Sequence, residues 1–170
     1  MKPITRSLSA LLACVLLCCA LLCACGQKEP PRTEVCTVSI TCGTILDNMP
    51  HLTAGKASLV PADGVLLPVT EVAFAEGETV FDLLQRVCRD NGIPMESSWS
   101  PLYNSAYIEG IANLYEFDCG ALSGWMYSVN GAYPNYGCSK YVLHDGDVVC
   151  WVYTCDLGED VGGGQAASGE

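Results

Sequence analysis

The sequence predicts an α+β domain in which a small β-grasp-like sheet packs against one main helix, at about residues 79–91. Three observations predict this class. Several segments alternate apolar and polar residues with a period of two, which is typical of half-buried strands. One segment has apolar residues at helical spacing instead. Turn signals such as Asn130-Gly131 and Asp145-Gly146 separate the later segments.

The first predicted strand covers residues 34–42. Its apolar side chains share one face, because side chains alternate between the two faces of a strand. A helical fragment around Ile45-Leu46, a short strand within 58–67 broken by a turn at Ala62-Asp63-Gly64, and a strand at 69–74 are expected next. The apolar face of the first strand consists of Cys36, Val38, Ile40 and Cys42.

The main helix has recognisable start and stop signals. Thr79 with Asp82 three residues later forms a capping-box pattern. Asn91-Gly92 provides a left-handed cap at the end. One apolar stripe must lie on a sheet, since a single helix cannot bury it alone. The stripe consists of Val80, Leu83, Leu84, Val87 and Cys88.

The remaining strands are expected in the second half of the chain. Residues 93–96 and 106–108 are predicted as short strands, with Ile111, Leu114 and Phe117 packing inward. Residues 124–129, 140–143 and 147–155 are predicted as further strands, and the last places Val149, Trp151 and Tyr153 on one face.

The first 24 residues have the pattern of an export signal. Lys2 and Arg6 are followed by an uncharged, almost wholly apolar stretch from Leu8 to Cys25. Its end, Leu22-Cys23-Ala24-Cys25-Gly26, resembles the bacterial lipoprotein box, in which the signal is cut before a cysteine that is then acylated. An uncleaved anchor is the alternative, because 18 residues make a helix of about 27 Å, near the lower limit for spanning a bilayer. Both alternatives place residues 26–170 outside the cytoplasm, attached to the cell membrane.

The mature chain is expected to have three parts. Residues 25–33 form a short polar tether after the lipidated Cys25, residues 34–155 form the folded domain, and residues 156–170 form a disordered acidic and Gly-rich tail. Without Lys2 and Arg6, six basic residues remain against 19 acidic residues, a formal charge of −13. Such a charge argues against nucleic acids and anionic membrane surfaces as partners, because phosphate binding needs Lys and Arg patches.

The cysteines leave several pairings open. Seven lie beyond Cys25, so at least one thiol is unpaired in an exported protein. Two cysteines at the ends of one strand lie too far apart for a disulfide, which excludes Cys36–Cys42 and Cys150–Cys155. Pairs between different elements remain possible, such as Cys36 or Cys42 with Cys150 or Cys155, and Cys119 with Cys138. The seven are Cys36, Cys42, Cys88, Cys119, Cys138, Cys150 and Cys155.

A series of short motifs resembles one known family. The series begins with Glu78 to Leu84, continues with Tyr107 to Ile111 and Gly124 to Gly131, and ends with Gly137, Tyr141 to Leu143, Asp145-Gly146-Asp147 and Trp151. In order and spacing it resembles the transcobalamin-like C-terminal domain, whose bacterial lipoprotein branch is a domain of unknown function. In transcobalamin and intrinsic factor, a related β-domain closes over one face of cobalamin, and a helical barrel absent from this sequence holds the other.

The resemblance implies a ligand surface in the last third of the chain. Aromatic residues at strand spacing suit a core equally well, whereas Tyr133 and Tyr136 lie in a loop where surface recognition is more common. A D-G-D sequence is a common hairpin turn, so no metal site is predicted at Asp145 and Asp147. The candidate ligand residues are Trp125, Tyr127, Asn130, Tyr133, Asn135, Tyr136, Trp151 and Tyr153.

These observations predict a lipid-anchored module that binds a small ligand outside the cytoplasm, with a corrinoid as the ligand that the resemblance implies. No cofactor is expected, and a second protein is expected to complete the site, since one aromatic face holds a large ligand weakly. A cell-surface adhesion or protein-interaction module without a small-molecule ligand is the alternative. No enzyme is predicted, because neither His51 nor His144 lies in a catalytic motif.

Overall fold

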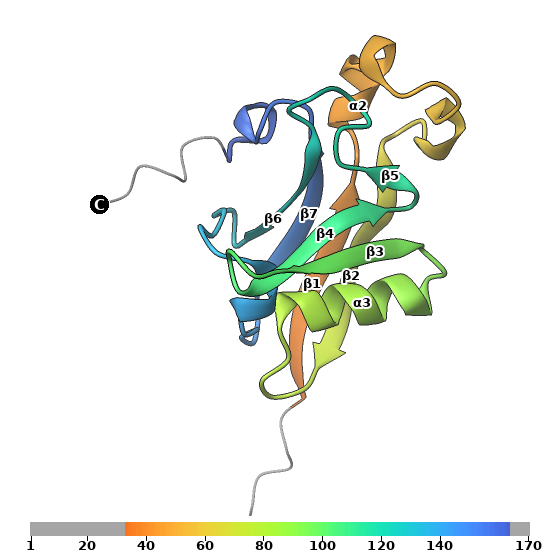
Figure 1. Cartoon of the computed structure of the whole chain (residues 1–170). Helices are drawn as coiled ribbons and strands as arrows, with labels where there is room; N and C mark the ends of the chain where they lie inside the picture. Colours follow the sequence, from red (N-terminus) through yellow and green to blue (C-terminus); the bar gives the residue numbers. More distant parts are fainter. Residues whose placement is uncertain (1–32, 164–170) are drawn as a thin grey trace, which may run out of the picture. The chain divides into compact units, whose positions relative to one another are not determined.

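The computed structural model describes residues 33–163 (Figure 1). The predicted signal, the predicted lipidation site Cys25 and all of the predicted tether except Thr33 lie outside these residues. Four short 3-10 turns, η1 to η4, accompany the regular elements at Met49–His51, Ala57–Leu59, Cys138–Lys140 and Glu159–Val161. The strands and helices are β1 (Glu34–Thr41), α2 (Thr44–Asp47), β2 (Val65–Phe74), α3 (Val80–Asp90), β3 (Met95–Ser100), β4 (Ser105–Ile111), β5 (Leu114–Tyr115), β6 (Gly124–Val129) and β7 (Val148–Thr154).

The first sheet has four strands in the order β2-β1-β7-β6. β1 lies inside it, antiparallel to β2 and parallel to β7, and β6 pairs antiparallel with β7. The predicted alternation in β1 is confirmed, since its apolar residues are buried in turn. β6 is an edge strand, which leaves one of its sides free for other parts of the molecule.

The second sheet has three strands in the order β3-β4-β5. The prediction of one β-grasp-like sheet is therefore wrong, and the protein is a sheet-rich mixture of α and β structure with two sheets. Alternation in a strand fixes which face is buried but not which strand is its partner. The pairing of β4 with β3 and β5, rather than with the first sheet, could not be obtained from these patterns.

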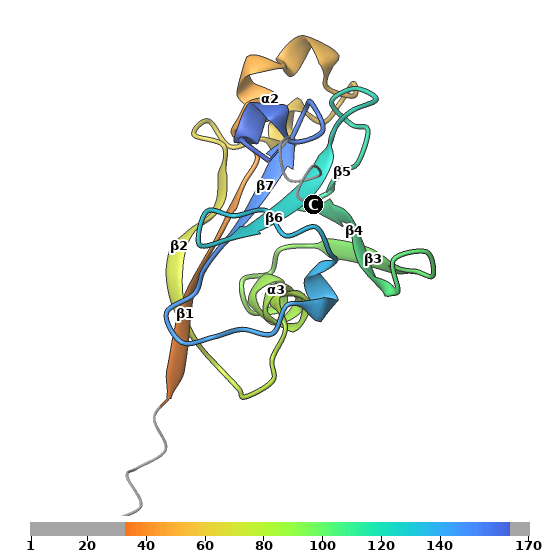
Figure 2. The same ribbon diagram turned by 90° about the vertical axis from the view of Figure 1, so that its left-hand side faces the viewer.

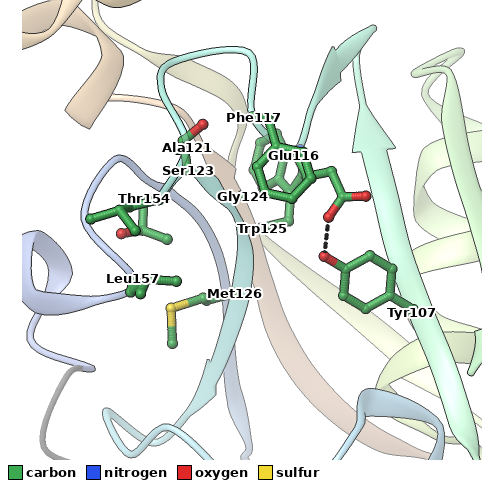
Figure 3. A pocket seen from close by; sticks show the side chains of 11 residues that line it. Tyr107, Glu116, Phe117, Ala121, Ser123, Gly124, Trp125, Met126, Thr154 and Leu157 are labelled. Carbon is green, nitrogen blue, oxygen red and sulfur yellow. Dashed lines mark hydrogen bonds between the residues drawn. The ribbon is translucent and has the colours of Figure 1, made fainter. Parts of the chain in front are cut away.

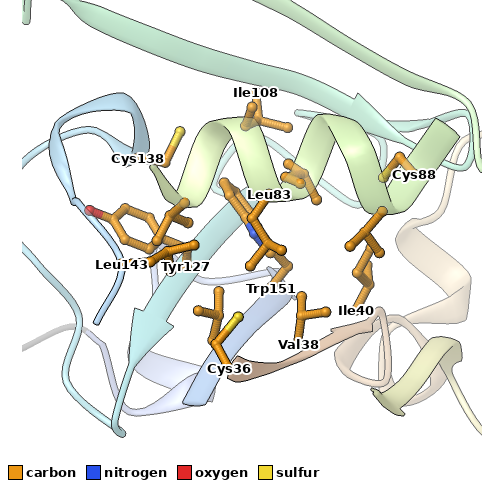
Figure 4. Packing of buried hydrophobic residues seen from close by; sticks show 14 of the residues in the cluster. Cys36, Val38, Ile40, Leu83, Cys88, Ile108, Tyr127, Cys138, Leu143 and Trp151 are labelled. Carbon is orange, nitrogen blue, oxygen red and sulfur yellow. The ribbon is translucent and has the colours of Figure 1, made fainter. Parts of the chain in front are cut away.

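The helix α3 lies between the two sheets. Figure 2 looks along it and shows β1 and β2 on one side and β3 on the other. The capping box is formed as predicted, with Asp82 N–H donating to Thr79 Oγ1 (3.2 Å) and Thr79 N–H donating to Asp82 Oδ2 (3.0 Å). All five residues of the predicted stripe are buried. In Figure 4, Ile108 of β4 lies across the helix from Cys36 and Val38 of β1.

Two clusters of buried residues make up the core. The larger one joins α3 to both sheets, and the smaller one lies around α2 and the end of β7. The smaller cluster contains Cys42, Ile45, Leu114, Cys119 and Tyr153, all of them almost fully buried. This second cluster supports the loop that follows β5, and that loop contributes to the site described below.

Several local predictions need correction. Residues 140–143 form no strand, although Val142 makes an isolated bridge to Thr79. Part of the segment 58–67 is a 3-10 turn, and a single strand, β2, starts at Val65. Within the first part of the predicted tail, residues 159–161 form η4, and Asp160 accepts hydrogen bonds from Cys155 N–H (2.7 Å) and Thr154 Oγ1 (2.5 Å).

Candidate functional site

A pocket of about 390 Å³ opens between β4 of one sheet and the edge strand β6 of the other (Figure 3). The segment after β5 and the segment after β7 form its rim. Its volume lies near the lower end of the range for small-molecule sites, about 300–1,000 Å³. The larger side chains that line the pocket include Tyr107, Glu116, Phe117, Trp125, Met126 and Leu157.

Two large apolar side chains are exposed on this rim. Phe117 is 61% exposed and Leu157 is 67% exposed. Both have a left-handed backbone, with φ of +66° at Phe117 and +46° at Leu157. A bulky residue rarely adopts positive φ, and the cost is about 1–2 kcal/mol. Strained backbone of this kind concentrates at ligand sites, where the surrounding structure enforces it.

Hydrogen bonds hold the loop that carries Phe117. Phe117 N–H donates to Ser123 O (3.0 Å), and Cys119 N–H donates to Ser123 Oγ (3.0 Å). The buried carboxylate of Asp118 accepts from Tyr115 N–H and from Lys56 Nζ. Because the loop is anchored at its base, the Phe117 ring is presented without a large loss of loop entropy on binding.

The rim segment that carries Leu157 is held in a similar way. Thr154 Oγ1 accepts from Gly158 N–H (2.7 Å) and from Asp156 N–H (3.1 Å). Leu157 N–H donates to Leu122 O (2.9 Å), which joins this segment directly to the loop after β5. The two sides of the rim are therefore already linked through the backbone.

One polar pair lies on the β4 side of the pocket. The Tyr107 hydroxyl donates to the Glu116 carboxylate. Burial, followed by the hydrogen bond to Glu116, raises the pKa of Tyr107 to about 12, so this phenol stays protonated at neutral pH. No lysine or arginine lines the pocket among the described residues. The site thus favours an apolar ligand with a neutral or cationic hydrogen-bonding edge.

Trp125 is the one predicted ligand residue that lines this pocket. Its indole N–H donates to Leu114 O (2.8 Å), and its ring packs edge-on against Tyr153 at 5.2 Å between centroids. The other strand aromatics are core residues. Trp151 is 2% exposed, Tyr153 is 0% exposed, and Tyr127 donates its hydroxyl to Tyr136 O (2.8 Å).

The predicted loop residues lie elsewhere or have structural partners. Asn130 and Gly131 have positive φ, and Asn130 links β6 to β7 by donating to Asp147 Oδ1 (2.8 Å) and accepting from Val148 N–H (2.9 Å). Tyr133 is partly buried and donates to Val161 O (2.9 Å). Tyr136 is exposed and stacks on Tyr141 at 6.4 Å, and Asn135 is exposed.

The Asp145-Gly146-Asp147 sequence forms a turn, as predicted. Asp147 Oδ2 accepts from His144 N–H (2.9 Å), and Asp145 Oδ1 accepts from Val35 N–H (2.9 Å). Within residues 33–163 no group of three or more His, Cys, Asp or Glu side chains is arranged to hold a metal ion.

Most of the pocket does not follow from the sequence patterns. These patterns predict Phe117 in the core and Leu157 in the tail, whereas both side chains are exposed on the rim. Positive φ at a non-glycine residue has no reliable signal in sequence. Tyr107 and Glu116 come together because β4 pairs with β5, which brings the residue after β5 beside β4.

Residues 77–155 match the family described as Domain of unknown function (DUF4430). The matched segment contains every pocket-lining residue except Leu157. No curated protein matches the sequence significantly. The family match and the structural similarity below confirm the expected resemblance to transcobalamin-like domains at the level of fold.

Solved structures show where else this fold occurs. The crystal structure of haptocorrin in complex with Cbi matches with a TM-score of 0.51 and 15% sequence identity, over 79% of this chain. The match covers 28% of the haptocorrin chain, so this chain spans little more than a quarter of that protein. A candidate metal binding protein from Ruminococcus gnavus ATCC 29149 matches at 12% identity over 71% of this chain and 96% of its own, with a TM-score of 0.42.

Proposed function

We propose that this chain binds a small, planar and largely apolar molecule in the pocket between β4 and β6. The observation that carries the proposal is the pair Phe117 and Leu157, two exposed apolar side chains held at strained backbone positions on opposite sides of one rim. Apolar side chains exposed around a concave site mark ligand or partner surfaces. Trp125 and Met126 provide further apolar surface inside the pocket.

A corrinoid is the ligand class that we propose. Its flat macrocycle suits stacking on aromatic rings, and its amide side chains suit donation to Glu116. The transcobalamin-like fold and the similarity to haptocorrin in complex with Cbi support this choice, although at 15% identity they concern the fold. A pocket of 390 Å³ at one edge of the domain covers only part of such a ligand. We therefore propose that a second protein covers the rest.

The variants Phe117→Asn and Leu157→Asn test this proposal. Cyanocobalamin titrated into the full chain in detergent is expected to bind weakly, and each variant is expected to weaken binding by about tenfold. The free energy of unfolding should stay equal or rise by up to about 1 kcal/mol, since asparagine tolerates left-handed backbone. Calorimetry and urea unfolding measure the two effects.

Leu102→Asn is the matched control, because Leu102 is 83% exposed and lies outside the pocket. It should change neither affinity nor stability appreciably. Absence of any binding heat at high concentration, or equal loss of affinity in Leu102→Asn and Phe117→Asn, would contradict a ligand site in the pocket.

We also propose that Cys25 attaches the protein to the outer face of the membrane. The basic start, apolar stretch and Ala24-Cys25 sequence support this. In the described part of the chain, no helix is long and apolar enough to span a bilayer. Mass spectrometry of protein from its host is expected to find Cys25 as the acylated first residue. Cys25→Ser should block processing and Cys23→Ser should not, whereas an intact Met1 on membrane-bound protein would favour an uncleaved anchor.

A protein-interaction module remains the second candidate, and one surface favours it. The β3–β4 hairpin exposes Trp99, Leu102 and Tyr103, and residues 97–108 carry no charge. Exposed aromatic residues without nearby charges are typical of interface centres. If cyanocobalamin fails to bind while Leu102→Asn abolishes retention of a defined cell-surface partner, this second function is the correct one.

A further inference from the structure

Cys119 and Cys155 lie together behind the rim of the pocket. Cys119 belongs to the smaller core cluster, and Cys155 packs against that cluster. The two thiols contact the two ends of α2: Cys155 Sγ donates to Thr44 Oγ1 (3.8 Å) at its start, and Cys119 Sγ donates to O of the capping residue Asn48 (3.5 Å). Asn48 Nδ2 donates to Thr44 O (2.9 Å), so the two thiols lie against residues that are themselves in contact.

The two cysteines occupy the two sides of the rim. Cys119 is two residues after Phe117, and Cys155 is two residues before Leu157. Near the rim, a backbone hydrogen bond from Leu157 N–H to Leu122 O (2.9 Å) joins these two segments. A covalent bond between the two sulfur atoms would connect the same two segments far more firmly.

We propose that Cys119 and Cys155 form a disulfide that fixes the two sides of the pocket rim relative to each other. The sequence alone does not single out this pair among the pairings between elements. Cys138 belongs to the larger core cluster and Cys119 to the smaller one, which argues against a Cys119–Cys138 bond. All seven described cysteines are free thiols in the structure.

The two thiols differ in exposure, and this difference determines which one reacts first with an oxidant. Cys155 is partly exposed and Cys119 is buried. The Cys155 thiolate attacks a low-molecular-weight disulfide such as oxidised glutathione, forms a mixed disulfide and releases one thiol. Cys119 then loses its proton and attacks the Cys155 sulfur, which releases the second thiol. The two cysteines are oxidised by two electrons, and the small disulfide is reduced by two.

Burial, followed by the contact with Cys119, raises the pKa of Cys155 to about 12. Little thiolate is present at neutral pH, so oxidation is slow without a catalyst. An equilibrium measurement in a glutathione redox buffer is therefore the appropriate test.

Peptide mapping identifies the bond directly. Chymotryptic cleavage at Trp125 or Tyr127 separates Cys119 from Cys138, and cleavage at Trp151 or Tyr153 separates Cys150 from Cys155. We expect the full chain, equilibrated with oxidised glutathione, to yield a Cys119–Cys155 peptide that reduction removes. The oxidised chain should also unfold at a temperature about 10 °C above that of the reduced chain, because the closed loop has 37 residues.

Two variants complete the test. Cys155→Ser should abolish both the linked peptide and the rise in unfolding temperature. Cys150→Ser, a change of another partly exposed cysteine nearby in the chain, should preserve both. Absence of the linked peptide, linkage of Cys155 to Cys42, or linkage without any rise in unfolding temperature would overturn the proposal. These measurements use no ligand, so they stand or fall separately from corrinoid binding.

Discussion

Replacing Trp151 by alanine is expected to lower the free energy of unfolding by about 3–5 kcal/mol. Trp151 is 2% exposed in the larger core cluster, and its ring packs on Tyr127 at 5.5 Å between centroids. Alanine would leave a large cavity between β7 and α3, and closely packed surroundings collapse only partly into such a cavity. Most of the stability of a domain of this size would be lost.

The variant Trp151→Phe separates burial from ligand contact. Trp151 Nε1 is buried without a hydrogen-bond partner among the described residues. A buried donor without a partner costs about 1–3 kcal/mol, so its removal offsets part of the cavity that phenylalanine leaves. We expect Trp151→Phe to cost about 1 kcal/mol or less, well below the alanine variant.

Urea unfolding followed by far-UV circular dichroism measures both Trp151 variants. Cyanocobalamin binding should survive in Trp151→Phe, which remains folded. If Trp151→Ala leaves stability unchanged but abolishes binding, Trp151 contacts the ligand and its placement in the core is wrong.

The sequence predicts those features that short-range patterns determine. The helix α3 has its stripe, its capping box and its left-handed glycine at Gly92, all as predicted. β1, β6 and β7 lie close to their predicted bounds for the same reason. In each case neighbours in sequence are neighbours in structure, so periodicity and capping chemistry suffice.

The pocket depends on how the two sheets are placed relative to each other, and short-range sequence patterns carry no information on that placement. Alternation put Trp151 and Tyr153 on one face, but could not distinguish a ligand face from a core face. The division into two sheets places Tyr107 near Trp125, and no local signal predicts that division. Phe117 and Leu157 have left-handed backbones, which their side chains disfavour locally. The hydrogen bonds of the surrounding loops hold them in this conformation.

The rim of the pocket packs directly on the smaller core cluster. The smaller core cluster contains Cys119 and Tyr153, and Tyr153 also packs on Trp125 in the pocket. A change that loosens this cluster should therefore disturb both the pocket and the proposed disulfide. Gly64 packs against the backbone of Gly43, next to Cys42 of this cluster, so a substitution at Gly64 is expected to loosen it.

Gly64→Ala is expected to lower the free energy of unfolding by about 3 kcal/mol or more. Gly64 is buried with φ of +69°, and an added Cβ would lie 2.5 Å from Gly43 Cα and 2.8 Å from Gly43 N. Both contacts involve backbone, which cannot rotate away. The shift would strain the hydrogen bonds that Gly64 O accepts from Cys42 N–H (2.7 Å) and Thr41 Oγ1 (2.9 Å).

Gly77→Ala provides the matched control for this substitution. Gly77 has φ of +80°, but nothing lies within 4 Å of its added Cβ, so only the backbone preference of about 1–2 kcal/mol is lost. Urea unfolding should rank the two variants clearly. Because Cys42 belongs to the smaller cluster, Gly64→Ala should also increase alkylation of Cys42 and Cys119 under native conditions. Equal losses of stability in the two variants would show that the loop around Gly43 moves aside, and that the contact with its backbone does not hold this cluster in place.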